Sequence, residues 1–188
     1  MNSVQAYLVD FDGTLADTSD ANYFAYSSAL QEIGICFSRE QFDRLAFGKN
    51  WRQFLPAILK EFNSTADPFS IASRKVELYQ RTADKIRFNE ALIFLLKNKN
   101  PNIKTALVTS ASTANVRAVL SYRLELKDLF DVIVTGDDVT RHKPDTQGYV
   151  MAANMLTVSA EKCIVFEDSD VGVMAGRSFG AHVLCIRF

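Results

Sequence analysis

Five short apolar runs, separated by stretches with helical periodicity, constrain the fold of this 188-residue chain more than any other feature. Each run is rich in Val, Ile, Leu or Phe and lacks the polar alternation of a strand with one solvated face. Runs of this kind are typical of parallel strands that helices cover on both faces. They span residues 4–9, 103–108, 132–135, 163–166 and 182–186. Strands that alternate with helices predict an α/β fold with a doubly wound parallel sheet.

Three of the segments between these runs carry helix-end signals. We expect helices over residues 90–97, 113–124 and 171–179. Pro101 follows the first and cannot continue a helix, and Gly180 follows the third, where glycine commonly caps a helix. These helices would supply the connections between successive strands.

The interval between the first two strands is far longer than an ordinary crossover. It contains two capping-box pairs and an Asp-Pro helix start, at Ser38/Gln41, Asn50/Gln53 and Asp67/Pro68. Apolar residues from Trp51 to Phe62 recur at helical spacing. We therefore expect residues 17–86 to form a helical subdomain, inserted into a core made of residues 1–16 and 87–188.

Composition excludes several classes of protein. With 48% hydrophobic residues and a formal net charge of -1, the chain is neither disordered nor suited to neutralising nucleic-acid phosphates. No apolar run is long enough to cross a bilayer, and the N-terminal segment lacks the basic start of a signal peptide. Because Cys36, Cys163 and Cys185 are scattered, we expect reduced, buried thiols. We expect a cytoplasmic monomer or weak dimer that binds neither nucleic acid nor membranes.

Polar residues gather where the expected strands end. The first strand ends in two aspartates, the second in hydroxyl residues and the fourth in an acidic pair, and a lysine follows the third. These residues are Asp10, Asp12, Thr109, Ser110, Ser112, Lys143, Glu167 and Asp168. In an open α/β sheet the carboxyl ends of the strands meet at one edge, which is where ligands bind.

This group of residues indicates phosphoryl chemistry. Carboxylates that are pressed together repel one another unless a cation neutralises them, and Mg²⁺ is the natural hard, oxygen-seeking ion. A lysine and a hydroxyl facing that ion suit the remaining oxygens of a phosphoryl group. Each residue alone could be a turn residue, a helix cap or a solvated charge. Their order along successive strands is what favours a catalytic site.

Four segments that carry these residues resemble the motifs of haloacid dehalogenase superfamily phosphatases. They are DFDGTLADT at 10–18, LVTSAS at 107–112, HKPD at 142–145 and FEDSDVG at 166–172. They are similar above all to the branch containing β-phosphoglucomutase, phosphoglycolate phosphatase and sugar-phosphate phosphatases. The helical insertion resembles that family's α-helical cap. The resemblance implies a Rossmann-like core and a Mg²⁺-dependent phosphatase that acts on a small phosphorylated metabolite.

The resemblance also implies a role for each motif residue. Asp10 would be the nucleophile that forms an aspartyl-phosphate, and Asp12 the general acid and then the general base. Ser110 would hydrogen-bond a phosphoryl oxygen, with Thr109 as the alternative, and Lys143 would offset negative charge. We expect the residues around the bound phosphate to include Gly13, Thr14, Thr109 and Ala111.

The resemblance implies that Mg²⁺ is held by the Asp10 carboxylate, the Asp12 backbone carbonyl and Asp168, with Glu167 binding directly or through water. Some relatives carry another aspartate where this chain has Gly172, so Glu167 must supply that charge. The chain ends directly after the fifth strand, so we expect that edge of the sheet to be less covered.

A further segment, Gly48 to Arg52, resembles the substrate-specificity loop of the cap. Lys49 and Arg52 either meet a second anionic group of the substrate or lie on a solvated helix face. A Schiff base at Lys49 has no other support in the sequence. The identity of the phosphorylated substrate cannot be read from these residues.

Three other functions deserve comparison with the phosphatase. A phosphosugar mutase is the nearest, but Thr14 gives the first motif its phosphatase-like form, and Asn22 stands where the mutases tend to have histidine. A phosphoacceptor receiver domain would place its acceptor after the third strand, near Asp137 and Asp138, and would have no 70-residue insertion. A binding protein with a vestigial site is disfavoured because no catalytic position is missing.

Overall fold

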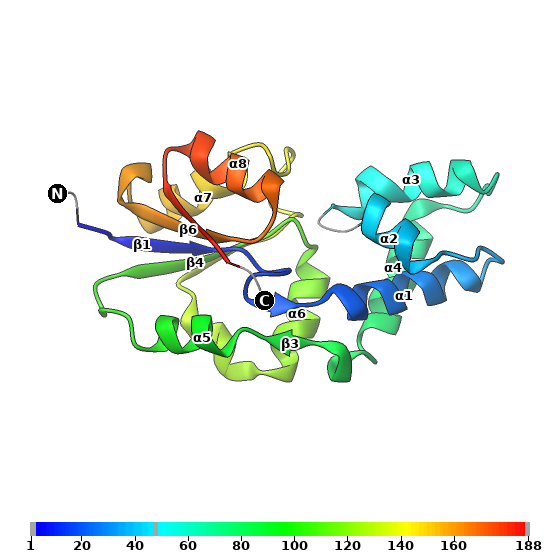
Figure 1. Cartoon of the computed structure of the whole chain (residues 1–188), viewed down its shortest axis with the longest axis horizontal. Helices are drawn as coiled ribbons and strands as arrows, with labels where there is room; N and C mark the ends of the chain where they lie inside the picture. Colours follow the sequence, from blue (N-terminus) through cyan, green and yellow to red (C-terminus); the bar gives the residue numbers. More distant parts are fainter. Residues whose placement is uncertain (1–2, 47–48, 187–188) are drawn as a thin grey trace.

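The computed structural model describes residues 3–46 and 49–186 (Figure 1). All five expected strands are present and form one sheet in the order β5-β4-β1-β6-β7. The strands are β1 (Ala6–Val9), β4 (Lys104–Val108), β5 (Val132–Val134), β6 (Cys163–Glu167) and β7 (His182–Cys185). Every neighbouring pair is parallel. The predicted α/β fold with a doubly wound parallel sheet is confirmed.

Helices cover both faces of this sheet, as the apolar runs require. On one side lie α5 (Glu90–Lys97) and α6 (Thr113–Tyr122), and on the other lie α7 (Gln147–Leu156) and α8 (Asp170–Phe179) (Figure 1). Successive residues of a strand point to opposite faces, so Val9 packs in the cluster under α5 and α6, whereas Leu8 packs in the cluster under α7 and α8. Short 3₁₀ turns complete the connections at Ala83–Lys85, Leu124–Leu129 and Ala160–Lys162.

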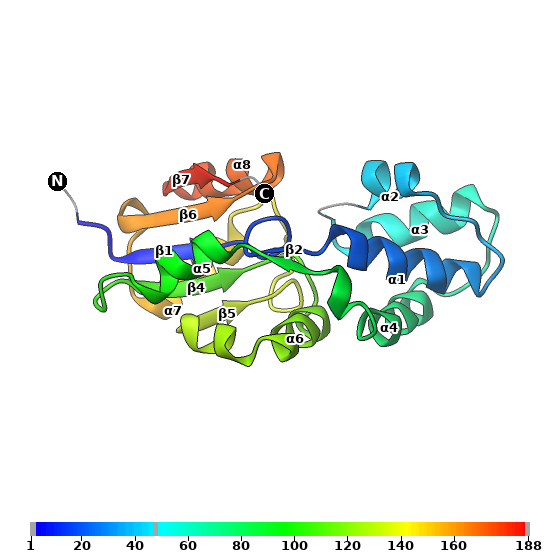
Figure 2. The same cartoon turned by 60° about the horizontal axis from the view of Figure 1, so that its bottom comes forward.

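Four helices lie beyond the carboxyl ends of the strands (Figures 1 and 2). They are α1 (Ser19–Gln31), α2 (Arg39–Leu45), α3 (Trp51–Glu61) and α4 (Pro68–Tyr79), together called the cap below. The predicted helix starts are confirmed, because Ser38 and Asn50 form complete capping boxes and Asp67 caps α4. The buried apolar residues of the cap are continuous with those beneath α5 and α6.

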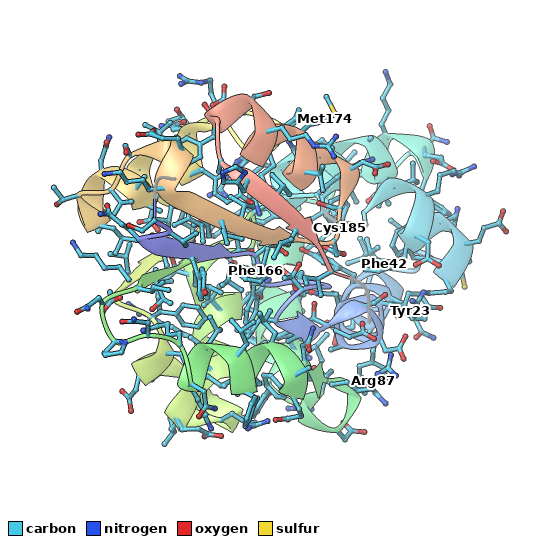
Figure 3. The ribbon with its side chains drawn as sticks, turned by 60° about the vertical axis from the view of Figure 1, so that its left-hand side comes forward. Tyr23, Phe42, Arg87, Phe166, Met174 and Cys185 are labelled. Atoms are coloured by element: carbon cyan, nitrogen blue, oxygen red, sulfur yellow. The ribbon has the colours of Figure 1, made fainter. Side chains whose placement is uncertain are left out.

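A short ribbon joins the cap to the core. β2 (Ala16–Asp17) pairs antiparallel with β3 (Arg87–Phe88), and the Asp17 carboxylate forms an ion pair with Arg87. These two strands are difficult to predict from the sequence, because each is two residues long and pairs with residues about 70 positions away. Figure 3 labels Arg87 on β3 and shows Tyr23 beside Phe42 in the cap, where their ring centroids are 5.8 Å apart.

The expectation that all three thiols are buried is wrong. Cys163 is buried, but Cys36 and Cys185 are exposed, and all three are free. Cys185 lies on β7 (Figure 3), which pairs only with β6 among the described residues, so this edge of the sheet is open. The apolar run 182–186 therefore contains a strand, as predicted, but that strand is largely exposed. Within the described ranges, no helix has the length and apolar character needed to span a membrane.

Candidate active site

Most of the predicted site residues meet at the carboxyl ends of β1, β4 and β6, under the cap. A cavity of ≈ 80 Å³ lies there, lined from the core by residues that include Asp10, Asp12, Ser110 and Lys143. One carboxylate oxygen from each of Asp10, Glu167 and Asp168 lies within 4.8 Å of the others. The adjacency of β1 to both β4 and β6 brings residues more than 150 positions apart to one site.

Lys143 is the buried cation of this cluster. Its ammonium group donates to Asp10 Oδ1 at 2.6 Å, to Glu167 Oε1 at 2.6 Å and to the Val108 carbonyl at 3.0 Å. Burial alone would lower the pKa of Lys143, but the negative charges of Asp10 and Glu167 outweigh it and raise that pKa well above its usual value. Lys143 is therefore a fixed positive charge beside the Asp10 carboxylate.

One lysine does not neutralise three carboxylates. Burial, followed by the charge of Glu167, raises the pKa of Asp10 well above its usual range. The same two causes raise the pKa of Asp168 to about 6. The charged forms of Asp10 and Asp168 are therefore disfavoured without a further cation, and carboxylate oxygens are the donors that a hard divalent ion prefers. The residues present fit such an ion.

Glu167 is fully buried, and its carboxylate accepts five hydrogen bonds, three from side chains and two from backbone N–H groups. Tyr149 donates its hydroxyl to Oε1 at 2.9 Å, next to Lys143, and Ser169 Oγ donates to Oε2 at 3.0 Å. A Cβ atom at position 172 would lie 1.8 Å from Oε1, so only glycine leaves room for this side chain. Gly172, which stands where some relatives have an aspartate, thus leaves the space that the buried Glu167 side chain occupies.

Asp12 receives its hydrogen bonds from the first residues of the cap. Its Oδ1 accepts from the Thr18 hydroxyl and, at 3.5 Å, from the Asn22 amide. Asn22 in turn accepts from the Lys75 ammonium at 2.7 Å. Burial raises the pKa of Asp12, so this carboxyl group is protonated more readily than an exposed aspartate.

Lys75 is the main feature that the sequence reasoning missed. It is 1% exposed, it lies over the ring of Tyr79, and burial lowers its pKa to about 7. A signal was available, because Lys75 occupies the apolar stripe of α4 between Ile71 and Leu78, where a lysine is out of place. Tyr149 and Ser169 were missed as well, since their role depends on where Glu167 lies.

The turn after β1 packs against Asp168, one of the three carboxylates of the acidic cluster. Gly13 has a φ of +85°, and a Cβ there would lie 2.0 Å from Asp168 Oδ2. Thr14 is fully buried and donates its hydroxyl to Asp168 Oδ1 at 3.3 Å. Both residues touch Asp168 rather than lining the cavity, so a direct contact between either of them and a substrate stays a prediction.

The loop after β4 carries the two candidate hydroxyls. Thr109, Ser110 and Ala111 all line the cavity. The Thr109 hydroxyl accepts the Ala111 N–H at 3.0 Å. This internal bond engages Thr109 and favours Ser110 as the hydroxyl that faces a phosphoryl group.

The two predicted cap cations are placed differently. Lys49 lines the cavity, whereas Arg52 stacks on the Trp51 ring at 4.5 Å and lies 3.5 Å from the Asp137 carboxylate. Arg52 therefore bridges cap and core outside the cavity. Gly48, the first residue of the predicted specificity loop, lies outside the described residues.

Comparison with known proteins agrees with this geometry. Residues 7–186 match the haloacid dehalogenase-like hydrolase family, and the chain belongs to it. It is 27% identical to fructose-1-phosphate phosphatase YqaB of Escherichia coli, over 96% of this chain and 95% of that protein. It is 30% identical to β-phosphoglucomutase of Bacillus subtilis, over 94% of this chain and 80% of that protein. The predicted family is therefore confirmed, and the protein is a hydrolase of this family.

A solved structure matches nearly the whole chain. The crystal structure of CbbY from Rhodobacter sphaeroides, a complex with phosphate, has a TM-score of 0.90 to this protein at 25% identity. The match covers 98% of this chain and 87% of that one. The similarity includes the helical cap as well as the sheet, because the cap makes up a large part of the matched length.

Proposed function

We propose that this protein is a Mg²⁺-dependent phosphatase of small phosphorylated sugars or similar metabolites, acting through an aspartyl-phosphate. One observation carries the proposal: Asp10 lies 2.6 Å from the buried Lys143 ammonium, in a cavity that also contains Asp12. A carboxylate fixed beside a cation, next to a carboxyl group that can hold a proton, is the arrangement that nucleophilic phosphoryl transfer requires. A relative that hydrolyses fructose 1-phosphate supports the substrate class.

The reaction would proceed in two steps. The Asp10 carboxylate attacks the phosphorus atom, the bond between phosphorus and the leaving oxygen breaks, and Asp12 gives its proton to that oxygen. Asp12 then takes a proton from water, which attacks the phosphorus of the aspartyl-phosphate. Inorganic phosphate leaves and the Asp10 carboxylate is restored. Lys143 offsets charge on Asp10 throughout, and Ser110 hydrogen-bonds a phosphoryl oxygen.

We propose that Mg²⁺ is held by Asp10, Asp168 and the Asp12 carbonyl, with Glu167 binding directly or through water. When bound, the ion neutralises the carboxylates and withdraws charge from the phosphoryl oxygens. We also propose that residues 17–86 act as a cap over the core site. Lys49 is the cation placed to meet a second anionic group of a substrate. The cytoplasmic location and the monomeric or weakly dimeric state stay predictions.

The proposal is tested with Asp10→Asn and an aryl phosphate. A neutral amide is a poor nucleophile and a poor Mg²⁺ ligand, so turnover should fall by more than about a thousandfold. Asp43→Asn, which removes an exposed carboxylate of α2, is the matched control and should keep wild-type turnover. Retention of a tenth of the wild-type rate by Asp10→Asn would remove Asp10 from the nucleophile role. Undiminished turnover in excess chelator would contradict the metal assignment.

A phosphosugar mutase is the second candidate, because a β-phosphoglucomutase is among the relatives. Product analysis separates the two functions. A phosphatase releases inorganic phosphate from each active sugar phosphate, whereas a mutase returns the phosphoryl group to the sugar and yields an isomer. A panel of sugar and polyol phosphates, assayed for both products, also identifies the substrate. We expect inorganic phosphate, and a predominant isomer product would contradict that expectation.

A further inference from the structure

The side chain of Asn50, the N-cap residue of α3, is buried and makes two hydrogen bonds. It is 3% exposed. Its Oδ1 accepts the Arg52 N–H at 3.1 Å, which caps the helix. Its Nδ2 donates to the Ser110 carbonyl at 3.1 Å, which belongs to the loop after β4 in the core. The amide of Asn50 is therefore a direct hydrogen bond from the cap to the loop that carries the candidate phosphate hydroxyl.

The peptide unit that receives this bond is also held from other sides. Its N–H, which belongs to Ala111, donates to the Thr109 hydroxyl at 3.0 Å. The Ala111 carbonyl, in the following peptide unit, accepts from the Gly136 N–H at 2.7 Å. A Cβ at position 136 would lie 2.3 Å from the Ser110 oxygen and 3.1 Å from Asn50 Nδ2. The Ser110 carbonyl thus lies between Asn50 of the cap and Gly136 of the loop after β5.

Helix capping alone does not account for this arrangement. A capping side chain needs only an acceptor oxygen, and Ser38 provides one for α2 with a hydroxyl group. Capping does not need the Nδ2 donor of Asn50, which instead hydrogen-bonds the Ser110 carbonyl of the core. Asn50, Ser110 and Ala111 line the same cavity as Asp10.

We propose that Asn50 is a positioning residue, which acts through Ser110. By fixing the peptide between Ser110 and Ala111, it holds the loop in the geometry that binds a phosphoryl group. A residue of the cap thereby completes the phosphate site of the core. We expect the effect to be independent of the leaving group, because the proposed function assigns this loop to the phosphoryl group that alkyl and aryl esters share. The proposal rests on the proposed function, because it takes this loop as the phosphate site.

Two substitutions at position 50 separate positioning from capping. Asn50→Ala removes both contacts, whereas Asn50→Ser restores an N-cap oxygen but has no group that reaches Ser110. Ser38→Ala removes the equivalent cap of α2 without touching the core. The measurements are the melting temperature, the dissociation constant of inorganic phosphate by calorimetric titration with Mg²⁺ present, and kcat/KM for an aryl and an alkyl phosphate.

We expect Asn50→Ser to melt between the wild type and Asn50→Ala, because it keeps an N-cap oxygen but leaves the Ser110 carbonyl without its donor. It should bind phosphate about threefold to tenfold more weakly, as the loss of one net hydrogen bond predicts. Asn50→Ala should bind phosphate equally weakly and melt lower, and kcat/KM should fall by the same factor for both esters. Ser38→Ala should lower the melting temperature alone.

Phosphate binding by Asn50→Ser within twofold of the wild type would overturn the proposal. Wild-type protein that binds phosphate without hydrolysing esters would contradict the proposed function, and the comparison at position 50 would still decide this inference.

Discussion

At the scale of single residues, the two aspartates of the first motif have different surroundings. Asp10 lies against Lys143 and the other carboxylates of the core. Asp12 faces the cap, where Thr18 and Asn22 hydrogen-bond its Oδ1. A carboxylate beside a fixed cation suits a nucleophile, and a carboxyl group with a raised pKa suits a proton donor. The division of roles that we propose for these two chemically identical side chains rests on the difference between their neighbours.

Asp12→Asn should affect alkyl and aryl esters unequally. A sugar alkoxide is a basic leaving group and needs the proton, so attack on an alkyl phosphate should slow by roughly a hundredfold to ten-thousandfold. An aryl oxide leaves without help, while the aspartyl-phosphate still needs the base. Phosphoenzyme should therefore accumulate, with a burst of about one phenol per site in rapid-mixing kinetics. Equal losses for both esters without a burst would remove Asp12 from the acid–base role.

Lys75→Met should change the pH dependence of stability. Burial lowers the pKa of Lys75 from 10.5 to about 7, so between those values the unfolded chain holds a proton that the folded chain releases. Wild-type stability therefore gains a contribution as pH rises through this window, and loses it as pH falls towards 7. Methionine carries no such cost. The melting temperature of the variant, relative to the wild type, should rise by several degrees from pH 10 to pH 6.5.

The control for this prediction is Lys60→Met, which replaces an exposed lysine of α3. Its melting temperature relative to the wild type should not vary across the same pH range. A pH-independent difference for Lys75→Met as well would mean that the folded protein does not lower the pKa of Lys75.

At the scale of elements, the turn from β6 into α8 shows how a strand end and a helix start are fitted to each other. Ser169 caps α8 through the Gly172 N–H and also donates its hydroxyl to Glu167. Gly172 lies in the first turn of the helix, directly against the Glu167 carboxylate. The acidic cluster therefore depends on the small size of a residue that has no chemistry of its own.

Gly172→Ala tests this dependence. Helix propensity alone would stabilise the variant by about 1 kcal/mol. The added Cβ would lie 1.8 Å from Glu167 Oε1, so the carboxylate must move, and with it the hydrogen bonds to Lys143 and Tyr149. We expect a lower melting temperature and a smaller stabilisation by Mg²⁺. Met174→Ala, on the exposed side of the same helix, is the control. A stabilised variant with the full Mg²⁺ response would contradict the account.

The elements that could be predicted from the sequence are those specified by local signals. The strands follow from their apolar runs, and the starts of α2 and α3 follow from capping boxes that span four residues each. Features that depend on distant partners could not be predicted in this way. The β2–β3 ribbon, the contact of Lys75 with Asn22 and the exposure of Cys185 each require knowledge of what lies alongside. The acidic cluster was predictable only because parallel strands end at a common edge.

At the scale of the whole molecule, the cavity has walls from two sources. The sheet supplies the charged groups from its strand ends, and the cap supplies Lys49, Asn50 and Trp51 from the opposite side. Polar contacts join the two across the cavity rim, from Asn50 to Ser110 and from Arg52 to Asp137. A phosphorylated molecule in this cavity would touch both parts. We therefore expect the core to supply the chemistry and the cap to supply most of the choice of substrate.

Stability of the whole chain should respond to Mg²⁺ in a pH-dependent way. The raised pKa of Asp168, about 6, means that without a cation the folded state loses stability as pH rises from the ordinary value of 3.8 through 6. A divalent ion binds the ionised form and reverses that loss. The increase in melting temperature with Mg²⁺ should be larger at pH 7.5 than at pH 5. Asp168→Asn should lose the response while melting no lower than the metal-free wild type at pH 7.5.

The central claim is that Asp10 carries the phosphoryl group during turnover. An aspartyl-phosphate is reduced by borohydride to homoserine, whereas a free carboxylate is not. The direct measurement is therefore peptide mass spectrometry of protein that is turning over an aryl phosphate and is quenched with borohydride. We predict homoserine at position 10, in an amount that rises with substrate and is absent without it. Efficient turnover by protein that yields no homoserine at position 10 would contradict the account.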